Sequence, residues 1–288
     1  MAQSLQDIRR RIRSVQNMER VTAAMKMVSA SKLRRAQERA QAARPYAEKM
    51  RDMLVNVSGN VDEFRHPLLE ARPVKRSAVL LVTADRGLAG AYNSNMIRAA
   101  EAYLRGRPQP SLIDVGRKGR DHFRKRGYPI LAEFVGIGDE ATLALAHEVG
   151  DEVMRIYQAG EADEIAIGYA QFLNAVQSRP TITPLLPLTA ARDSGGHAGP
   201  GARAYIAEPD AGAVLTRLLP HYVYTLVFRA LLEAKASEHG ARMAAMDNAS
   251  RNAREVIDHL TLVRNRVRQA AITKEIAEIV AGAEALRA

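Results

Sequence analysis

The sequence predicts an α/β protein with long helices, in which an antiparallel coiled coil of the N- and C-terminal helices carries an inserted, Rossmann-like α/β domain. Three observations support this prediction. Heptad-like apolar repeats run through both ends of the 288-residue chain. Short apolar runs alternate with helical stretches in its middle. The composition favours closely packed helices, because alanine is abundant, tryptophan is absent and aromatic residues make up only 5% of the chain.

Residues 1–58 are predicted to form the N-terminal helix of the coiled coil. In its second half, apolar or small residues alternate in steps of three and four, at Leu33, Ala36, Ala40, Ala43, Ala47, Met50, Leu54 and Val57. The first half repeats the pattern at Leu5, Ile8, Ile12, Val15, Met18, Val21, Met25 and Val28. Two consecutive three-residue steps, from Val15 to Met18 and on to Val21, predict a break in the register. We also expect Pro45 to kink this helix.

Residues 75–190 are predicted to form the α/β domain. Five apolar runs of strand type alternate with helical stretches, which indicates a small open sheet covered by helices. The predicted strands are 78–83, 111–115, 129–135, 164–172 and 181–188, and the predicted helices are 92–104, 116–126 and 140–158.

A Gly/Pro-rich loop over 191–208 separates this domain from a C-terminal coiled-coil helix over 209–288. We expect Pro220 to kink or interrupt the start of that helix. A helix of about 75 residues would be roughly 110 Å long. Heptad-like steps occur at Leu260, Val263, Val267 and Ala270, then at Ile272, Ile276, Ile279, Ala283 and Leu286. Because this helix is longer than its partner, part of it should project alone or be covered by other chains.

The bulk composition restricts the classes of function. A formal net charge of +10 and a pI near 10.0 favour acidic partners. The absence of cysteine excludes disulfides, thiolate metal sites and a cysteine nucleophile. The seven histidines are scattered and predicted to be surface or partner-facing residues. No apolar run approaches the roughly 18 residues of a membrane span, and the N-terminus lacks the hydrophobic run of a secretory signal, which predicts a cytosolic location.

No motif commits the chain to a reaction, so no catalytic, cofactor-binding or metal residues are predicted. The segment 85–90, DRGLAG, follows a predicted strand and precedes a helix. It is neither GxGxxG nor a P-loop, and a tight turn that uses Gly87 and Gly90 is favoured over a phosphate site. Seven carboxylates are predicted to face solvent at element ends or on helix surfaces, although paired-carboxylate catalysis stays open: Asp114, Asp139, Glu140, Asp151, Glu152, Asp163 and Glu164.

Three stretches resemble the gamma subunits of F-type ATP synthases. They are IRRRIRSVQNMERVTAAMKMVSASKLRRAQ (8–37), TADRGLAGAYN (83–93) and the long C-terminal stretch 236–286. Their order and the chain length also fit, so the resemblance covers the whole chain. It departs at Ala89, where many members have cysteine. Because no cysteine-bearing insert of the chloroplast type is present, the resemblance is to a bacterial member.

The resemblance implies a rotating shaft without a catalytic site of its own. The coiled coil would stand inside the hexameric ring of alpha and beta subunits, and the α/β domain would rest on the ring of c subunits with the epsilon subunit. Ion flow would turn the c ring and this chain, coupling transport to ATP synthesis or hydrolysis at the beta subunits. The chain would be a peripheral protein on the cytoplasmic face of the bacterial inner membrane, and no nucleic acid or cofactor is implied.

The resemblance also assigns site residues. Met25 would contact a beta-subunit loop, and Arg268, Gln269, Thr273 and Glu275 would form a polar cluster facing the beta catch loops. Ile276, Ile279, Val280 and Leu286 would lie in the bearing at the top of the ring. For Met25, ordinary seam packing is the alternative, and for Arg268 and Glu275 it is a solvated helix face. The basic excess would attract the shaft to carboxylates on beta-subunit loops.

Two other functions stay open at this point. The charge would suit a basic coiled coil that binds nucleic acid, but the aromatic and basic residues are not interleaved as in single-strand binders. The central domain would suit a Rossmann-like enzyme with helical extensions for oligomerisation. A salt-sensitive DNA mobility shift would favour the first function, and a tight nucleotide complex would favour the second.

Overall fold

The structure, a computed structural model, describes residues 4–58, 65–188 and 210–285. It divides into two compact units. The first unit contains Met1–Val28 and Met243–Ala288, and the second contains Ser29–Arg242. The predicted loop at 191–208 and Leu286 lie outside the described residues.

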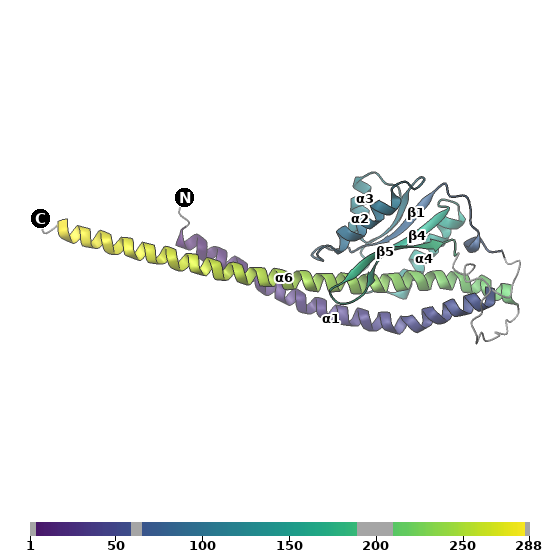
Figure 1. Cartoon of the computed structure of the whole chain (residues 1–288), viewed down its shortest axis with the longest axis horizontal. Coiled ribbons are helices and arrows are strands. Elements are labelled where there is room, and N and C mark those ends of the chain that lie inside the picture. The colour runs from purple at the N-terminus through teal and green to yellow at the C-terminus, as the bar shows by residue number, and fades with distance from the viewer. Residues whose placement is uncertain (1–3, 59–64, 189–209, 286–288) are drawn as a thin grey trace. The chain divides into compact units, whose positions relative to one another are not determined.

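Long helices occupy both ends of the chain, as predicted (Figure 1). They are α1 (Leu5–Ser58) and α6 (Ala211–Ala285). Helix α6 continues through Pro220, so of the two expected effects, a kink or an interruption, the interruption is wrong. Leu219 and Val223, on either side of the proline, are fully buried in the core of the second unit. Their packing offsets the roughly 3 kcal/mol that a proline costs inside a helix.

The second unit is built on a five-stranded sheet in the order β3-β2-β1-β4-β5. Strands β1 to β4 are parallel, and β5 is antiparallel to β4 at the edge. Their bounds lie close to the predicted ranges: β1 (Ser77–Val82), β2 (Ser111–Val115), β3 (Ile130–Phe134), β4 (Glu164–Phe172) and β5 (Ser178–Leu186). The predicted fold class is therefore confirmed.

Both faces of the sheet are covered at its centre, where every residue of β1 and β2 is buried. Residues of β1 alternate between two cores: Leu80 and Val82 belong to one, and Val79 and Leu81 belong to the other. Helices α2 (Tyr92–Leu104) and α3 (Arg117–Lys125) cover the second of these faces. Helix α4 (Leu143–Gln158), the 3₁₀ turn η1 (Pro67–Leu69) and segments of α1 and α6 cover the first. α4 begins three residues later than predicted because the Thr142 hydroxyl accepts a hydrogen bond from the Leu145 amide at 3.2 Å, as an N-cap does.

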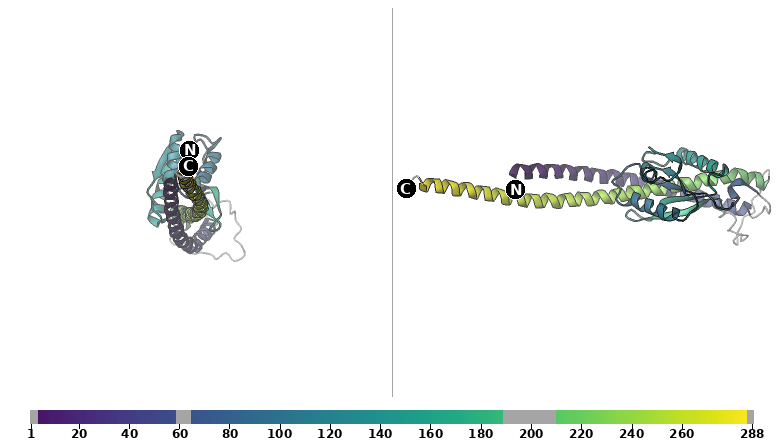
Figure 2. Two further views of the ribbon diagram at one scale, coloured as in Figure 1. Left: turned by 90° about the vertical axis from the view of Figure 1, so that its left-hand side faces the viewer. Right: turned by 90° about the horizontal axis from the view of Figure 1, so that it is seen from above.

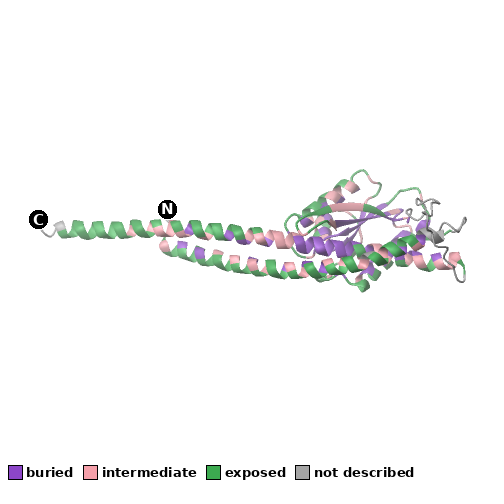
Figure 3. Cartoon of the chain, turned by 60° about the horizontal axis from the view of Figure 1, so that its bottom comes forward, coloured by how far each residue is buried: buried purple, intermediate pink, exposed green. Residues whose placement is uncertain are grey.

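One segment of α6 is buried on every side within the second unit (Figure 3). All ten residues from 231 to 240 are buried, including Glu233, Lys235, Glu238 and His239. The expectation that every histidine faces the surface or a partner is therefore wrong for His239. Burial lowers the pKa of His239, so its imidazole is held neutral more readily than in water.

The first unit is an antiparallel pair formed by the start of α1 and the end of α6 (Figure 2). Lys26 forms an ion pair with Asp247 at 2.6 Å, and Glu19 forms one with Arg254 at 2.9 Å. The two ion pairs are seven residues apart on each helix, and the numbering runs in opposite directions. The helices are therefore antiparallel with a heptad repeat. The apolar part of this seam contains Ile8, Ile12, Val15, Leu260, Val263 and Val267.

The predicted register break in α1 is wrong. From Val15 the seam continues in regular steps through Glu19, Thr22 and Lys26, whereas the side chains of Met18 and Val21 are 59% and 58% exposed. Glu19 belongs to the seam because it accepts hydrogen bonds from Ser250 and Arg254 across the interface. The Thr22 hydroxyl donates to the Met18 carbonyl at 3.0 Å. The seam positions are therefore held by the polar residues Glu19 and Thr22, and not by the adjacent apolar residues Met18 and Val21.

This correction predicts unequal effects of two alanine substitutions in the same helix. Ile12→Ala should lower the local free energy of unfolding of the first unit by about 2–4 kcal/mol, because it leaves a cavity in the seam. Met18→Ala should change it by less than about 0.5 kcal/mol, because the side chain is exposed. Hydrogen exchange of amides in residues 8–26 measures both. Equal losses of protection would restore the predicted register and contradict the observed seam.

Candidate functional site

The strand order indicates where a ligand of an open α/β sheet would bind. Such ligands bind beyond the carboxyl ends of parallel strands, at the point where the strand order reverses. In this sheet β2 and β3 lie on one side of β1, and β4 lies on the other. The reversal therefore falls between β1 and β4, beside the DRGLAG turn.

Helix α6 occupies this position. The Ser237 hydroxyl donates to the Ala170 carbonyl in β4 at 2.9 Å, and the Arg242 guanidinium donates to the Gly87 carbonyl in the turn at 3.3 Å. Gly240 lies so close to the loop after β4 that a Cβ at this position would be 2.8 Å from the Ala175 carbonyl oxygen. The chain's own helix thus fills the place where a Rossmann-like enzyme holds its nucleotide.

The close approach at Gly240 gives a matched pair of glycine substitutions within α6. Gly240→Ala should lower the free energy of unfolding of the second unit by about 1–2 kcal/mol, because overpacking against a backbone carbonyl outweighs the gain in helix propensity. At Gly282 an added Cβ meets nothing within 4 Å, so Gly282→Ala should stabilise the end of α6 by up to about 1 kcal/mol. Urea unfolding and hydrogen exchange separate the two effects. A gain in both variants would mean that α6 is not held against the loop.

The DRGLAG segment is a turn whose polar groups are used within the fold. Asp85 accepts hydrogen bonds from the amides of Arg117 at 3.0 Å and Ile137 at 2.9 Å, so it links the turn after β1 to the start of α3 and to the loop after β3. The backbone φ is positive at Leu88 (62°) and Gly90 (53°). The expectation that Gly90 has a left-handed backbone conformation is confirmed. The other left-handed residue is Leu88, and not Gly87 as expected. Asp85 therefore has a structural role.

Asp114 is buried in β2, which contradicts its predicted exposure to solvent. Strand β2 is covered on both faces, and neither carboxylate oxygen of Asp114 has a hydrogen-bond partner in the described structure. Burial, followed by the charge of Glu133, raises the pKa of Asp114 to about 7. The carboxylates do not gather into a metal centre either: within the described ranges no three His, Asp or Glu residues are placed to share an ion.

The end of α6 runs past the end of its partner. Continuing the match of Glu19 with Arg254, the first helical residue of α1, Leu5, lies level with Arg268. From residue 272 to residue 283 every α6 residue is exposed, including Ile276, Ile279 (70%) and Val280. Each exposed isoleucine forgoes about 1.5–3 kcal/mol of burial free energy. Groups of exposed apolar residues are typical of surfaces that contact another chain.

The structure places the predicted contact residues at two levels of the first unit. Met25 is half-buried beside the Lys26–Asp247 ion pair. Arg268, Gln269, Thr273 and Glu275 are all exposed near the end of α6. About twenty helical residues separate the two levels, which corresponds to roughly 30 Å. The predicted residues therefore do not form one site, and Leu286 lies outside the described part of the chain.

Sequence reasoning missed the cross-helix ion pairs of the first unit. Glu19 and Lys26 are seven residues apart, as are Asp247 and Arg254. Each helix thus carries one acidic and one basic residue a heptad apart, and the order of the two charges is complementary in an antiparallel pair. This spacing could have indicated the ion pairs from the sequence. The basic side chains beside this seam remain exposed, and they have no ion pair within the described residues: Arg9, Arg10, Arg11, Arg13 and Arg20. None of the described helices is long and apolar enough to span a bilayer.

Comparison with known proteins places this fold in a family. The family model described as ATP synthase matches residues 4–286. The ATP synthase gamma chain of Desulforamulus reducens is 50% identical over 283 residues, which cover 98% of this chain and 99% of the relative. That of Moorella thermoacetica is 49% identical over 284 residues, with the same coverage of both chains.

Solved structures agree. A chain of the Tetrahymena thermophila mitochondrial ATP synthase central stalk and c-ring has a TM-score of 0.63 at 26% identity, covering 80% of this chain and 99% of that one. A chain of the Euglena gracilis mitochondrial ATP synthase shares the fold, with a TM-score of 0.72 at 19% identity over 98% of this chain and 94% of that one. The full-length match, the terminal helices and the inserted sheet lead to one assignment: this chain belongs to the ATP synthase gamma chain family.

Proposed function

We propose that this chain is the central rotor shaft of a bacterial F-type ATP synthase and is not itself catalytic. Its coiled coil stands inside the ring of alpha and beta subunits. Its α/β domain sits with the epsilon subunit on the c ring, at the cytoplasmic face of the inner membrane. Ion flow turns the c ring and the shaft, and the asymmetric shaft moves the beta subunits in turn through different nucleotide-binding states.

The exposed end of α6 carries this proposal. Ile276, Ile279 and Val280 lie beyond the start of α1, where no described residue of the chain covers them. A bearing formed by the top of the ring would bury these side chains. In the same arrangement Met25 and the polar set of Arg268, Gln269, Thr273 and Glu275 would contact beta-subunit loops at two heights.

The position of α6 in the second unit supports the non-catalytic part of the proposal. The contacts of Ser237 with Ala170 and of Arg242 with Gly87 hold the helix at the carboxyl ends of β4 and β1. A nucleotide would have to displace a buried segment of the helix to bind there. The α/β domain therefore serves as a rigid mount for α6, and the chemistry belongs to the beta subunits.

The exposed arginines of α1 support an electrostatic fit to the ring. The chain carries a net charge of +10, and acidic loops facing the rotor would be attracted to it at several angles. Such an attraction between exposed charges weakens as salt is added. The same residues would hold the shaft in preferred positions between steps.

The test is co-expression of this chain with the alpha and beta subunits of the same organism. We expect one large complex on size exclusion, with sustained ATPase activity that is lost when this chain is omitted. Reversal of the five N-terminal arginines to glutamate should weaken assembly or torque. Arg98→Glu, at an exposed position on α2 outside the coiled coil, serves as a control for reversal of a single charge. Separate elution of the chain, with ring activity unchanged, would reject the rotor proposal.

A further inference from the structure

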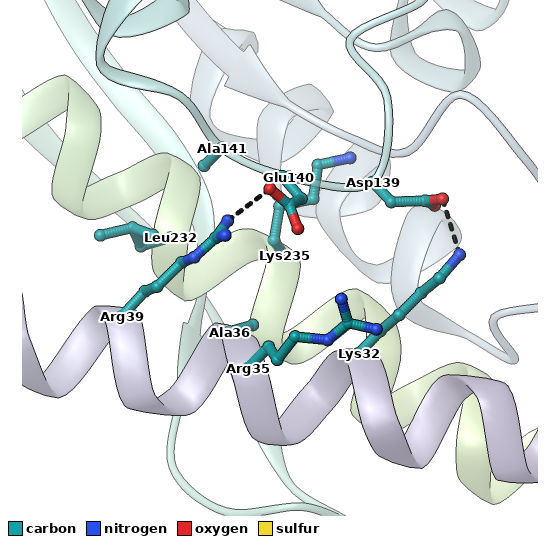
Figure 4. A pocket seen from close by; sticks show the side chains of 9 residues that line it. All are labelled: Lys32, Arg35, Ala36, Arg39, Asp139, Glu140, Ala141, Leu232 and Lys235. Atoms are coloured by element: carbon teal, nitrogen blue, oxygen red, sulfur yellow. Dashed lines mark hydrogen bonds and ion pairs between the residues drawn. The ribbon is translucent and has the colours of Figure 1, made fainter.

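A basic cavity lies within the second unit, between α1, α6 and the loop before α4. It has a volume of about 300 Å³. Lys32, Arg35 and Arg39 line it from one face of α1, where spacings of three and four residues place them above one another. Lys235 of α6 lines the opposite side, and its side chain is only 7% exposed. Figure 4 shows Lys32, Arg35 and Arg39 extending from α1 toward the loop, with Lys235 behind Glu140.

Two carboxylates from the loop neutralise two of the α1 cations. Lys32 forms an ion pair with Asp139 at 2.6 Å, and Arg39 forms one with Glu140 at 2.7 Å. The Arg39 hydrogen bond lowers the pKa of Glu140, and the charge of Arg35 adds to the effect. Arg35 makes no hydrogen bond or ion pair with any described residue. It lies between two paired cations, so the lining has more positive than negative charge.

The buried Lys235 adds to this excess. Its ammonium donates to the Gly138 carbonyl at 2.7 Å and lies 3.3 Å from Glu238. Glu238 is shared with the Arg242 guanidinium at 2.8 Å, so one carboxylate faces two cations. Arg35 and Arg39 are exposed, whereas Lys235 is buried, so the site lies at the border between solvent and the protein interior. Charges attract an anion more strongly there than in bulk water.

We propose that this cavity binds a phosphoryl oxyanion, either free phosphate or the phosphate chain of a nucleotide, with Arg35 as its main ligand. A guanidinium presents parallel N–H donors that match the oxygen atoms of a phosphate. A ligand with a single carboxylate would carry less negative charge and would leave part of the positive charge of the cavity uncompensated. The volume lies at the lower end of the range of small-molecule sites, about 300–1,000 Å³. It therefore suits a phosphoryl group better than a whole nucleotide. Binding joins α1 to α6 and the loop inside the second unit.

The test is calorimetric titration of the full-length chain with inorganic phosphate, ADP and ATP, each at constant ionic strength set by sodium chloride. We expect one saturable site, and Arg35→Gln should weaken it at least tenfold. Arg34→Gln is the matched control: Arg34 is the neighbouring residue on α1, lies outside the cavity and pairs with Glu38. Its affinity should equal that of the wild type. Arg35→Lys keeps the charge without the paired N–H donors of the guanidinium, so its affinity should fall between those of the wild type and Arg35→Gln. Circular dichroism verifies that each variant is folded.

The outcomes separate the two sources of the anion. Saturable binding of inorganic phosphate that depends on Arg35 supports a site for the free ion. Tighter binding of ADP or ATP with the same dependence supports a site for the phosphate chain. The proposal is overturned if none of the three ligands saturates, or if Arg34→Gln and Arg35→Gln weaken binding equally. Neither result bears on co-assembly with alpha and beta subunits, which tests the rotor proposal separately.

Discussion

Replacing Asp114 by asparagine should raise the free energy of unfolding of the second unit above pH 7 by on the order of 4 kcal/mol. The pKa of Asp114 rises from 3.8 to about 7 in the folded chain, because burial disfavours its charged form. The folded state then binds a proton more tightly than the unfolded state. The wild type is therefore most stable at low pH with respect to this group, and it loses that stability as the pH rises from about 4 to about 7. Asparagine keeps the shape of the neutral acid and cannot ionise.

Urea unfolding at pH 5 and pH 8 measures this effect. The gain in the free energy of unfolding from Asp114→Asn should shrink to under about 2 kcal/mol at pH 5. At that pH the unfolded chain gains little from ionisation of Asp114, so the wild type loses little stability. Asp258→Asn, an exposed substitution on α6, controls for the loss of one negative charge and should change stability by less than about 0.5 kcal/mol. An Asp114→Asn variant that is less stable than the wild type at pH 8, with an unchanged pH dependence, would contradict the account of this buried carboxylate.

The double substitution Ile276→Asp and Ile279→Asp should weaken association with the alpha and beta subunits at least a hundredfold. Both side chains are exposed in the chain alone, so the unfolding of the isolated chain should barely change. In an apolar bearing each carboxylate would lose its water without gaining a partner, which costs several kcal/mol. The variant thus separates the stability of the chain from its assembly.

Dilution of the assembled complex, followed by size exclusion, measures that association. Ile276→Leu with Ile279→Leu is the matched control, because it keeps two apolar side chains of equal size and should assemble as the wild type does. Equal assembly of the aspartate and leucine variants would show that this part of α6 stays in water. The assignment of the bearing residues would then fail.

The centre of the sheet was predictable because β1 and most of β4 are apolar and buried on both faces. A continuous apolar run such as 78–82 is typical of a parallel strand that is covered on both faces. Asp114 was not predictable, because one carboxylate within an apolar run carries no sign of its own burial. Strand β5 is antiparallel to β4 because a tight hairpin joins them. In this hairpin the Asn174 side chain accepts hydrogen bonds from the amides of Val176 and Gln177.

The helical seams were less predictable wherever polar residues pair across them. A search for apolar residues selects Met18 and Val21, whereas Glu19 and Thr22 lie in the interface. Glu19 accepts a hydrogen bond from Arg254 across the seam, and the Thr22 hydroxyl donates to the Met18 carbonyl within α1. The buried segment 231–240 of α6 contains four ionisable residues and does not resemble a core helix. Its burial depends on partners far along the chain, such as Gly138 for Lys235, which no local pattern reveals.

Single-molecule observation of rotation tests whether this chain is a rotor. The chain contains no cysteine, so Lys125→Cys at the exposed end of α3 gives one attachment point for a bead. With the alpha and beta subunits fixed to a surface and ATP supplied, the bead should rotate in one direction, with pauses that correspond to the catalytic beta subunits. Undirected fluctuation of the bead, while the same immobilised complexes hydrolyse ATP, would contradict the rotor account.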